Sequence, residues 1–177
     1  MTVLVVMGVS GSGKTTIGQA LARRLDFEFI EGDEFHSRAN RQKMHAGQPL
    51  NDADREPWLE ALRSRIAAML ARKGNAVLTC SALRQSYRDH LAMPGVRFIY
   101  LKVSEPVVRA RLARRRGHFF NPALLESQFA ALEAPRDADA LVVDGDASDL
   151  EVTQQIIRDL KAAPADARAP RRATSKA

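Results

Sequence analysis

A glycine-rich segment near the N-terminus constrains the fold of this chain more than any other feature. Residues 8–15 read GVSGSGKT and match the pattern G-x-x-x-x-G-K-[ST]. The segment follows the apolar run 3–7 and leads directly into a helical pattern, which is the setting that this motif requires. Because glycine lacks a Cβ, its backbone N–H groups can curl around phosphate oxygens at the start of a helix. The sequence therefore predicts a nucleoside triphosphate site.

The residues expected to bind the nucleotide belong to this loop and to the helical turn that follows it. They are Gly8, Ser10, Gly11, Ser12, Gly13, Lys14, Thr15 and Thr16. We expect Lys14 to reach the β- and γ-phosphates and to act in catalysis, and we expect the Thr15 hydroxyl to hold Mg²⁺. The alternative, a glycine-rich turn with an incidental lysine, leaves the combination of strand, spacing and helix unexplained.

Short apolar runs alternate with helical patterns along the rest of the chain. The predicted strands are 3–7, 27–30, 76–80, 97–103 and 140–144. The predicted helices are 17–25, a helix that begins near Pro57 and ends before Gly74, 84–91, 106–116, 122–132 and 150–160. Nearly continuous apolar strands between helices predict an α/β fold whose parallel sheet is covered on both faces.

Length and composition are those of one domain. The chain has 177 residues, of which 45% are hydrophobic and 27% charged. Cys80 is the single cysteine, so neither an intrachain disulfide nor a cysteine-based zinc site is available, and we expect it to be a small buried residue. No apolar run reaches the roughly 18 residues of a membrane span, and the N-terminus lacks a signal-peptide pattern. We expect a cytoplasmic protein.

The formal charge of +6 is unevenly distributed. From residue 162 onward the chain is rich in proline and alanine and carries a net charge of +3. This composition predicts a disordered tail over 162–177 that follows a single domain over 1–161. The remaining positive charge suits an anionic ligand and does not require a nucleic acid.

Several absences narrow the kind of nucleotide-binding protein. There is no N-K-x-D guanine motif and no D-x-x-G after the third predicted strand. That strand also lacks the usual acidic residue at its end, and the chain is short for a motor domain. These features favour a small-molecule kinase that uses ATP and Mg²⁺.

The segment 32–58 is expected to bind the phosphoryl acceptor. It contains few aliphatic residues and follows the second predicted strand, where ligands bind in an open parallel sheet. Asp33 lies at that strand end and can orient or deprotonate an attacking hydroxyl. It can also support Mg²⁺ through water, and a helix N-cap is its alternative role. His36, Asn40 and Lys43 fall at i, i+4 and i+7, which places them on one polar face if the segment is helical.

The pattern of this segment resembles the gluconokinase family. GDEFHSRANRQKMHAGQPLNDADREPWL is similar to the family signature G-D-x-x-H-x-x-x-N-x-x-K-M-x-x-G-x-P-L-x-D-x-D-R-x-P-W-L. The resemblance continues through CSALR at 80–84, FIYL at 98–101, the arginine-rich run 111–120 and SQF at 127–129. It covers roughly residues 3–146. One departure is Arg84, where the family commonly has lysine, a residue of different hydrogen-bonding geometry.

The resemblance implies ATP-dependent phosphorylation of D-gluconate at O6. It also implies a nucleoside-monophosphate-kinase-like three-layer fold with a five-stranded parallel sheet, a mobile lid and a homodimer. Gluconate is a polyol carboxylate, so its site needs a cation for the carboxylate and polar groups for the hydroxyls. The cation candidates are Arg55, Arg84 and Arg88, whose alternatives are surface charges or local ion pairs. The hydroxyl partners are expected to be Asp33, His36, Asn40 and Ser81.

Arginines crowd the segment 109–116, which by composition alone is a basic helix or a nucleic-acid patch. In kinases of the implied fold this region is a lid, here about residues 109–122. By the resemblance, Arg111 is expected near the adenine and Arg115 near the phosphates, where it would stabilise transferred charge. His118 is expected to contact substrate or to pack. Two alternatives remain: a related kinase of another small acid or polyol such as shikimate, and a nucleic-acid-binding phosphate-loop protein.

Overall fold

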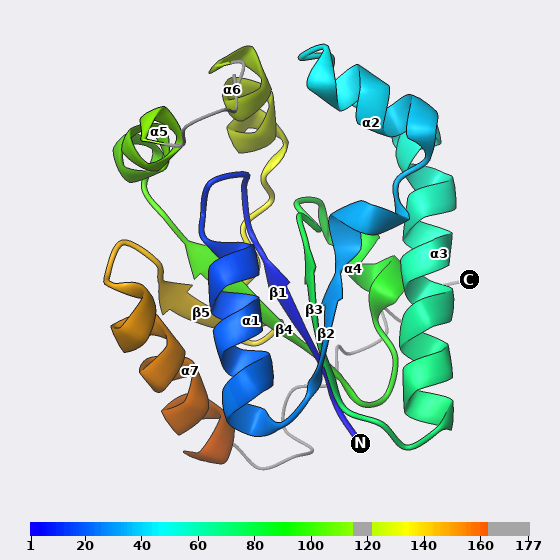
Figure 1. The fold of residues 1–177 in the computed structure, drawn as a ribbon, viewed down its shortest axis with the longest axis vertical. Helices are drawn as coiled ribbons and strands as arrows, with labels where there is room; N and C mark the ends of the chain where they lie inside the picture. The colour runs from blue at the N-terminus through cyan, green and yellow to red at the C-terminus, as the bar shows by residue number, and fades with distance from the viewer. Residues whose placement is uncertain (115–121, 163–177) are drawn as a thin grey trace, which may run out of the picture.

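The computed structural model describes residues 1–114 and 122–162, and the side chains of Pro122 and Ala123 are excluded. Its centre is a five-stranded parallel sheet in the order β2-β3-β1-β4-β5 (Figure 1). The strands are β1 (Val3–Met7), β2 (Glu28–Glu31), β3 (Ala76–Cys80), β4 (Val96–Lys102) and β5 (Leu141–Asp144). The predicted strands are confirmed, and their ends differ from the structure by one residue at most.

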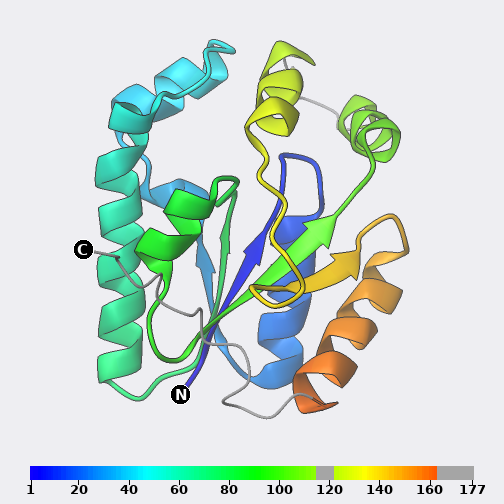
Figure 2. The ribbon, with the colours of Figure 1, turned by 180° about the vertical axis from the view of Figure 1, so that it is seen from behind.

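Helices follow each strand along the chain. They are α1 (Lys14–Leu25), the short 3-10 helix η1 (Gly32–Phe35), α2 (Arg38–His45), α3 (Asp52–Ala71), α4 (Gln85–Leu91), α5 (Glu105–Ala113), α6 (Pro122–Ala131) and α7 (Asp149–Ala162). Figures 1 and 2 show α1 and α7 over one face of the sheet and α3 and α4 over the other. The predicted three-layer α/β fold is confirmed.

The core lies on both sides of β1, which is the central strand and is wholly buried. Val3, Val5 and Met7 join the cluster that includes the apolar face of α3. Leu4 and Val6 join the cluster that includes α1 and α7. Successive side chains of a strand point to opposite faces, so one continuous apolar strand supplies both layers.

The predicted start of the helix near Pro57, which is α3 in the structure, is wrong. Instead of starting near Pro57, α3 begins at Asp52, because a capping box forms one turn earlier. The Asn51 side chain accepts the Asp54 N–H at 2.8 Å, and the Asp54 carboxylate accepts the Asn51 N–H at 3.0 Å. Pro57 therefore lies inside the helix, where it removes one backbone donor.

The carboxyl ends of the strands open toward α2 and α6, which stand above the sheet in Figure 1. The predicted lid, 109–122, overlaps the end of α5 and the start of α6, and its residues 115–121 lie outside the described part of the chain. The predicted tail also lies outside it, except for Ala162 at the end of α7. Within the described ranges, no helix has both the length and the apolar character needed to span a membrane.

Candidate active site

The phosphate loop is built as its sequence predicts. Gly11 and Gly13 have positive φ values of 80° and 96°, a region that disfavours side chains. A Cβ on Gly11 would also lie 2.9 Å from Leu112 of α5. Lys14 begins α1, and its Nζ donates to the Val9 carbonyl at 2.9 Å across the loop. The loop thus presents a helix N-terminus and a lysine at the same point, the arrangement that binds a triphosphate.

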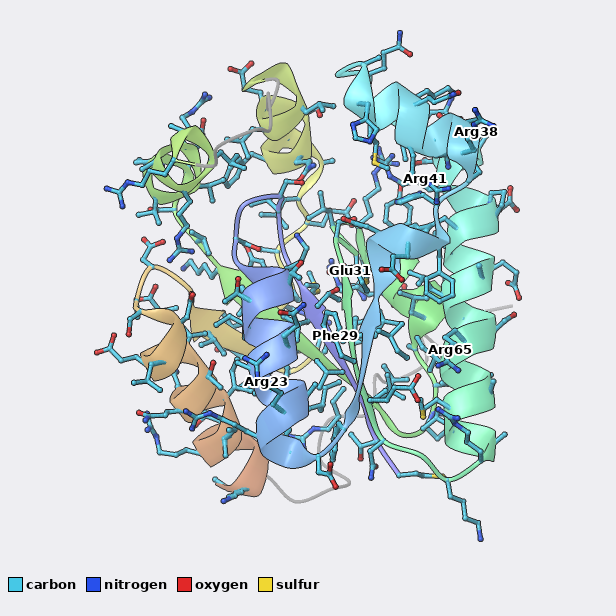
Figure 3. All side chains as sticks on the ribbon, in the orientation of Figure 1. Arg23, Phe29, Glu31, Arg38, Arg41 and Arg65 are labelled. Carbon is cyan, nitrogen blue, oxygen red and sulfur yellow. The ribbon has the colours of Figure 1, made fainter. Side chains whose placement is uncertain are left out.

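Glu31 supplies an acid beside Thr15, which sequence reasoning missed. The Thr15 hydroxyl donates to Glu31 Oε2 at 2.8 Å, and Thr79 of β3 donates to the other carboxylate oxygen. Figure 3 shows Glu31 where β2 ends. An acidic side chain of β2, the neighbour of β3, therefore contacts the Thr15 hydroxyl. The signal in the sequence was an acidic residue at a strand end, two positions before Asp33.

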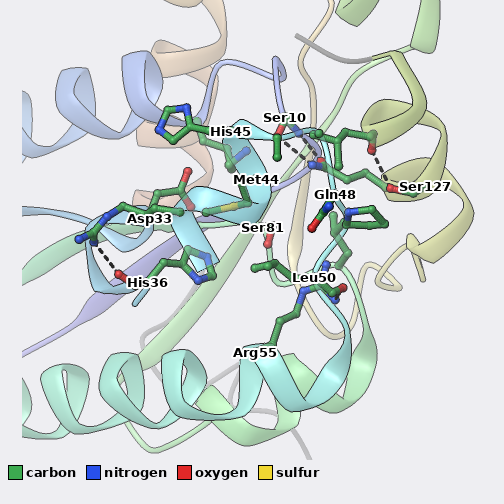
Figure 4. A pocket seen from close by; sticks show the side chains of 18 residues that line it. Ser10, Asp33, His36, Met44, His45, Gln48, Leu50, Arg55, Ser81 and Ser127 are labelled. Carbon is green, nitrogen blue, oxygen red and sulfur yellow. Dashed lines mark hydrogen bonds between the residues drawn. The ribbon is translucent and has the colours of Figure 1, made fainter. Parts of the chain in front are cut away.

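A pocket of about 550 Å³ opens next to the phosphate loop (Figure 4). Its lining comes from the loop, η1, α2 and the turn after it, α3, the β3–α4 loop and α6. These residues are Ser10, Lys14, Asp33, His36, Arg41, Met44, His45, Ala46, Gly47, Gln48, Pro49, Leu50, Arg55, Ser81, Leu83, Leu124, Ser127 and Gln128. Lys14 and Asp33, predicted from separate motifs, thus share one cavity.

His36 lies in this pocket but not on a helix, so the predicted His36–Asn40–Lys43 face is wrong. His36 follows η1, and Ser37 caps α2 by accepting the Asn40 N–H. The imidazole stacks on Trp58 with ring centres 4.5 Å apart, while the Trp58 indole donates to Gly32 O at 2.8 Å. Burial lowers the pKa of His36, despite the opposing effect of Asp33. A neutral imidazole can donate to one hydroxyl and accept from another.

Asn40 and Lys43 are directed to α3 and do not line the pocket. Asn40 Nδ2 donates to the Asp54 carbonyl at 2.6 Å, and Lys43 Nζ lies 2.6 Å from Asp54 Oδ1. Both residues therefore join α2 to the first turn of α3. The structure assigns them to shaping the pocket wall, whereas the sequence pattern assigned them to the substrate.

The three candidate arginines occupy different environments. Arg55 lines the pocket and donates to Leu50 O (Figure 4). Arg84 is partly exposed and pairs with Asp52 at 2.6 Å, outside the pocket lining. Arg88 is 3% exposed, and burial lowers the pKa of its guanidinium.

Arg88 holds two loops together. Its guanidinium donates to the carbonyls of Ala82, Leu83 and Glu133 at 2.8–3.0 Å and to the side chain of Gln85 at 2.8 Å. These contacts tie the segment after α6 to the β3–α4 loop that carries Ser81. Arg88 is thus a structural residue in this conformation, and only Arg55 of the three lies where a pocket ligand can meet it.

Arg41 is a further cation that lines the pocket, and the sequence pattern did not single it out. Its Nη1 donates to the carbonyls of Glu34 and His36, so it also holds the turn that carries His36. Its exposed position in α2 looked like that of any solvated basic residue, and only the fold places it over the cavity.

Arg111 connects the phosphate loop to the β5–α7 loop. It donates to Ser12 O at 3.3 Å, Gly145 O at 2.9 Å and Ala147 O at 3.4 Å. Arg111 therefore lies beside the phosphate loop, and its expected contact with the adenine stays a prediction. The other two predicted lid residues, Arg115 and His118, lie outside the described residues.

Cys80 is buried as predicted, and burial raises the pKa of its thiol to about 12, so it is not a nucleophile.

Comparisons with known proteins agree with this architecture. The family model described as "AAA domain" matches residues 3–137. The gluconokinase of Gluconobacter oxydans (strain 621H) is 45% identical over 163 residues, which cover 90% of this chain and 91% of that protein.

Two solved structures are also similar. The crystal structure of a gluconokinase from Sinorhizobium meliloti 1021 has a TM-score of 0.82 and 41% identity, and the match covers 91% of this chain and 92% of that one. The structure of a sugar kinase from Janibacter sp. HTCC2649 has a TM-score of 0.86 and 40% identity, with 93% and 97% covered. Together with the shared pocket of Lys14 and Asp33, these similarities show that the chain belongs to the gluconokinase family.

Proposed function

We propose that this chain transfers the γ-phosphoryl group of ATP to O6 of D-gluconate, giving 6-phospho-D-gluconate and ADP. The observation that carries the proposal is the single pocket lined by both Lys14 and Asp33. Phosphoryl transfer depends mainly on bringing donor and acceptor together in a site of suitable charge. This pocket places a phosphate-binding cation and a proton-accepting carboxylate around one cavity.

The phosphate loop binds the nucleotide in this proposal. Its backbone N–H groups and Lys14 hold the phosphates, and Arg111 lies beside the loop at the side of the β5–α7 segment. The oxygens of Thr15 and Glu31 fit Mg²⁺, a hard cation that is usually held by one or two protein ligands plus phosphates and water. When bound, Mg²⁺ would neutralise charge on the phosphates. Within the described residues there is no group of three or more His, Cys, Asp or Glu side chains that could hold a metal ion.

The acceptor half of the pocket matches a polyol carboxylate. Asp33 takes the proton of the O6 hydroxyl as the new O–P bond forms and the bond to ADP breaks. His36 and Ser81 bind other hydroxyls of the acceptor. Arg55 binds the carboxylate, because Arg84 and Arg88 do not line the pocket and are engaged with other protein groups. Asp33, His36, Ser81 and Arg55 are labelled together in Figure 4.

The deciding assay measures ADP release from ATP with a panel of sugar acids, polyols and shikimate, and identifies the phosphorylated product. We expect release that depends on D-gluconate and a product phosphorylated at O6. Efficient turnover of shikimate or another polyol acid, without turnover of gluconate, would replace this proposal by the related-kinase alternative.

The nucleic-acid alternative has its own test. The chain and a variant ending at Ala162 are titrated with labelled single- and double-stranded DNA and RNA at several salt concentrations. We expect any binding to disappear when residues 163–177 are removed. The positive charge of this tail would attract nucleic-acid phosphates whatever the base sequence. Salt-dependent binding that persists in the shortened chain would favour a nucleic-acid function.

A homodimer, which the family resemblance suggests, is tested by light scattering of the same samples.

A further inference from the structure

Gln128 of α6 makes a two-point contact with the phosphate loop. The Ser10 backbone N–H donates to Gln128 Oε1 at 2.6 Å, and Gln128 Nε2 donates to Ser10 Oγ at 2.9 Å. The two residues are separated by 118 positions in sequence, and both line the pocket that contains Lys14.

The direction of these hydrogen bonds follows from their atoms. A backbone N–H can only donate, so the Gln128 atom that faces it must be the carbonyl oxygen. The amide nitrogen is then the atom that faces Ser10 Oγ, and it can only donate. Ser10 Oγ must therefore accept, and its own hydrogen points away from Gln128. Among the described residues, no hydrogen bond is found in which the Ser10 hydroxyl is the donor.

The surroundings keep Ser10 in place for such a role. On one side, Val108 and Leu112 of α5 pack against Gly11, the next residue of the loop. On the other side, Gln128 supplies the two hydrogen bonds. The loop residue is thus held in backbone and in side chain, and it lines the same cavity as Lys14 and Asp33 (Figure 4). A fixed donor beside a site of charge transfer is worth more than one that must reorient during the reaction.

We propose that Gln128 is a positioning residue that turns the Ser10 hydroxyl hydrogen toward the phosphoryl group being transferred. This rests on the proposed kinase function. Ser10 would share the charge of the moving phosphoryl oxygens with Lys14, and Gln128 would act only through Ser10. Glutamine is suited to this task because its amide offers one acceptor and one donor. A carboxylate offers only acceptors.

Gln128→Glu is the sharpest test, since it keeps both pairings but reverses one of them. The Ser10 N–H still donates to a carboxylate oxygen, but the Ser10 hydroxyl must now donate to the other oxygen and is withdrawn from the pocket. We expect kcat with gluconate to fall about tenfold in Gln128→Glu and in Ser10→Ala, with the melting temperature retained. The double variant Ser10→Ala/Gln128→Glu should be no slower than the slower single variant, because both changes remove the same donor.

Two further measurements separate this role from its rivals. An added charge that merely repels ATP would raise the KM for ATP and leave kcat at saturating ATP unchanged. A merely bracing role would let Gln128→Glu keep wild-type kcat, because both pairings survive. The same change at Gln154, on the exposed side of α7, is the matched control and should leave all constants unchanged.

Wild-type kcat in Ser10→Ala or in Gln128→Glu would overturn the proposal, as would an additive loss in the double variant. Failure of the kinase function itself would be recognised separately, because the unmodified chain would then release no ADP with gluconate.

Discussion

The phosphate loop and the acceptor pocket lie next to each other but are built in different ways. The loop is one continuous segment whose backbone makes the site, so residues 8–15 specify it almost alone. The pocket takes side chains from six separate segments. In the loop, a residue's place in the motif states its role. In the pocket, neighbouring polar residues divide between ligand contacts and structural contacts, and the division depends on the fold.

The arginines show this division most clearly, and Arg88 should give the largest effect. Arg88→Met leaves the carbonyls of Ala82, Leu83 and Glu133 without their buried donor. We expect the free energy of unfolding to fall by about 3 kcal/mol, measured by urea denaturation. Arg84→Met is the matched control one turn away, and its exposed ion pair should contribute under about 1 kcal/mol. Equal losses in the two variants would contradict the structural role of Arg88.

Replacing Arg55 should have the opposite result: a large effect on the KM for gluconate and a small effect on the free energy of unfolding. We expect Arg55→Ala to raise the KM for gluconate by about ten- to a hundredfold, because a charged pair with the carboxylate is lost. The KM for ATP should stay unchanged. The preference for gluconate over a neutral polyol of the same length should shrink by a similar factor. A preference that survives in Arg55→Ala would move the carboxylate to another cation, with Arg41 as the next residue to vary.

His36 offers a smaller effect that depends on pH. Its pKa is lowered from the ordinary value of 6.5 in the folded state, chiefly by burial against Trp58. Well above pH 6.5 both folded and unfolded states hold a neutral imidazole, so the residue adds no pH dependence there. At lower pH the unfolded state binds more protons than the folded state. The free energy of unfolding therefore decreases as the pH decreases, by at most about 1.4 kcal/mol per pH unit.

The measurement is urea denaturation between about pH 5 and pH 7.5. His36→Gln should reduce the slope of stability against pH below about pH 6.5. The same change at exposed His45 controls for the loss of an imidazole. An unchanged slope in His36→Gln would show that the buried stacking does not govern this titration.

The sequence predicted the sheet and the phosphate loop because both depend on local patterns. Continuous apolar runs mark buried parallel strands, and glycine spacing marks the loop. It did not reveal the contact of Glu31 with Thr15, since that contact depends on how β2 lies against α1. Nor did it reveal the burial of Arg88, because arginine is usually exposed and one of its acceptors, the Glu133 carbonyl, is 45 residues away in the sequence.

The start of α3 was predicted wrongly because two local signals disagreed. Pro57 resembled a first helical residue, and the capping box of Asn51 and Asp54 was not recognised in a segment read as a turn. That box moved the start of α3 one turn earlier and brought Arg55 onto the helix that lines the pocket. The local signal was present in the sequence, but the proline competed with it.

The central claim is that Asp33 and the phosphate loop act on one acceptor in one pocket. Asp33→Asn tests it most directly, with turnover of gluconate measured at saturating substrates and ATP affinity measured by calorimetry on the same samples. We expect turnover to fall by about 10²–10⁴-fold while ATP affinity is retained, because the carboxylate serves the acceptor and not the nucleotide. Unchanged turnover, or a loss explained entirely by weaker ATP binding, would contradict the account.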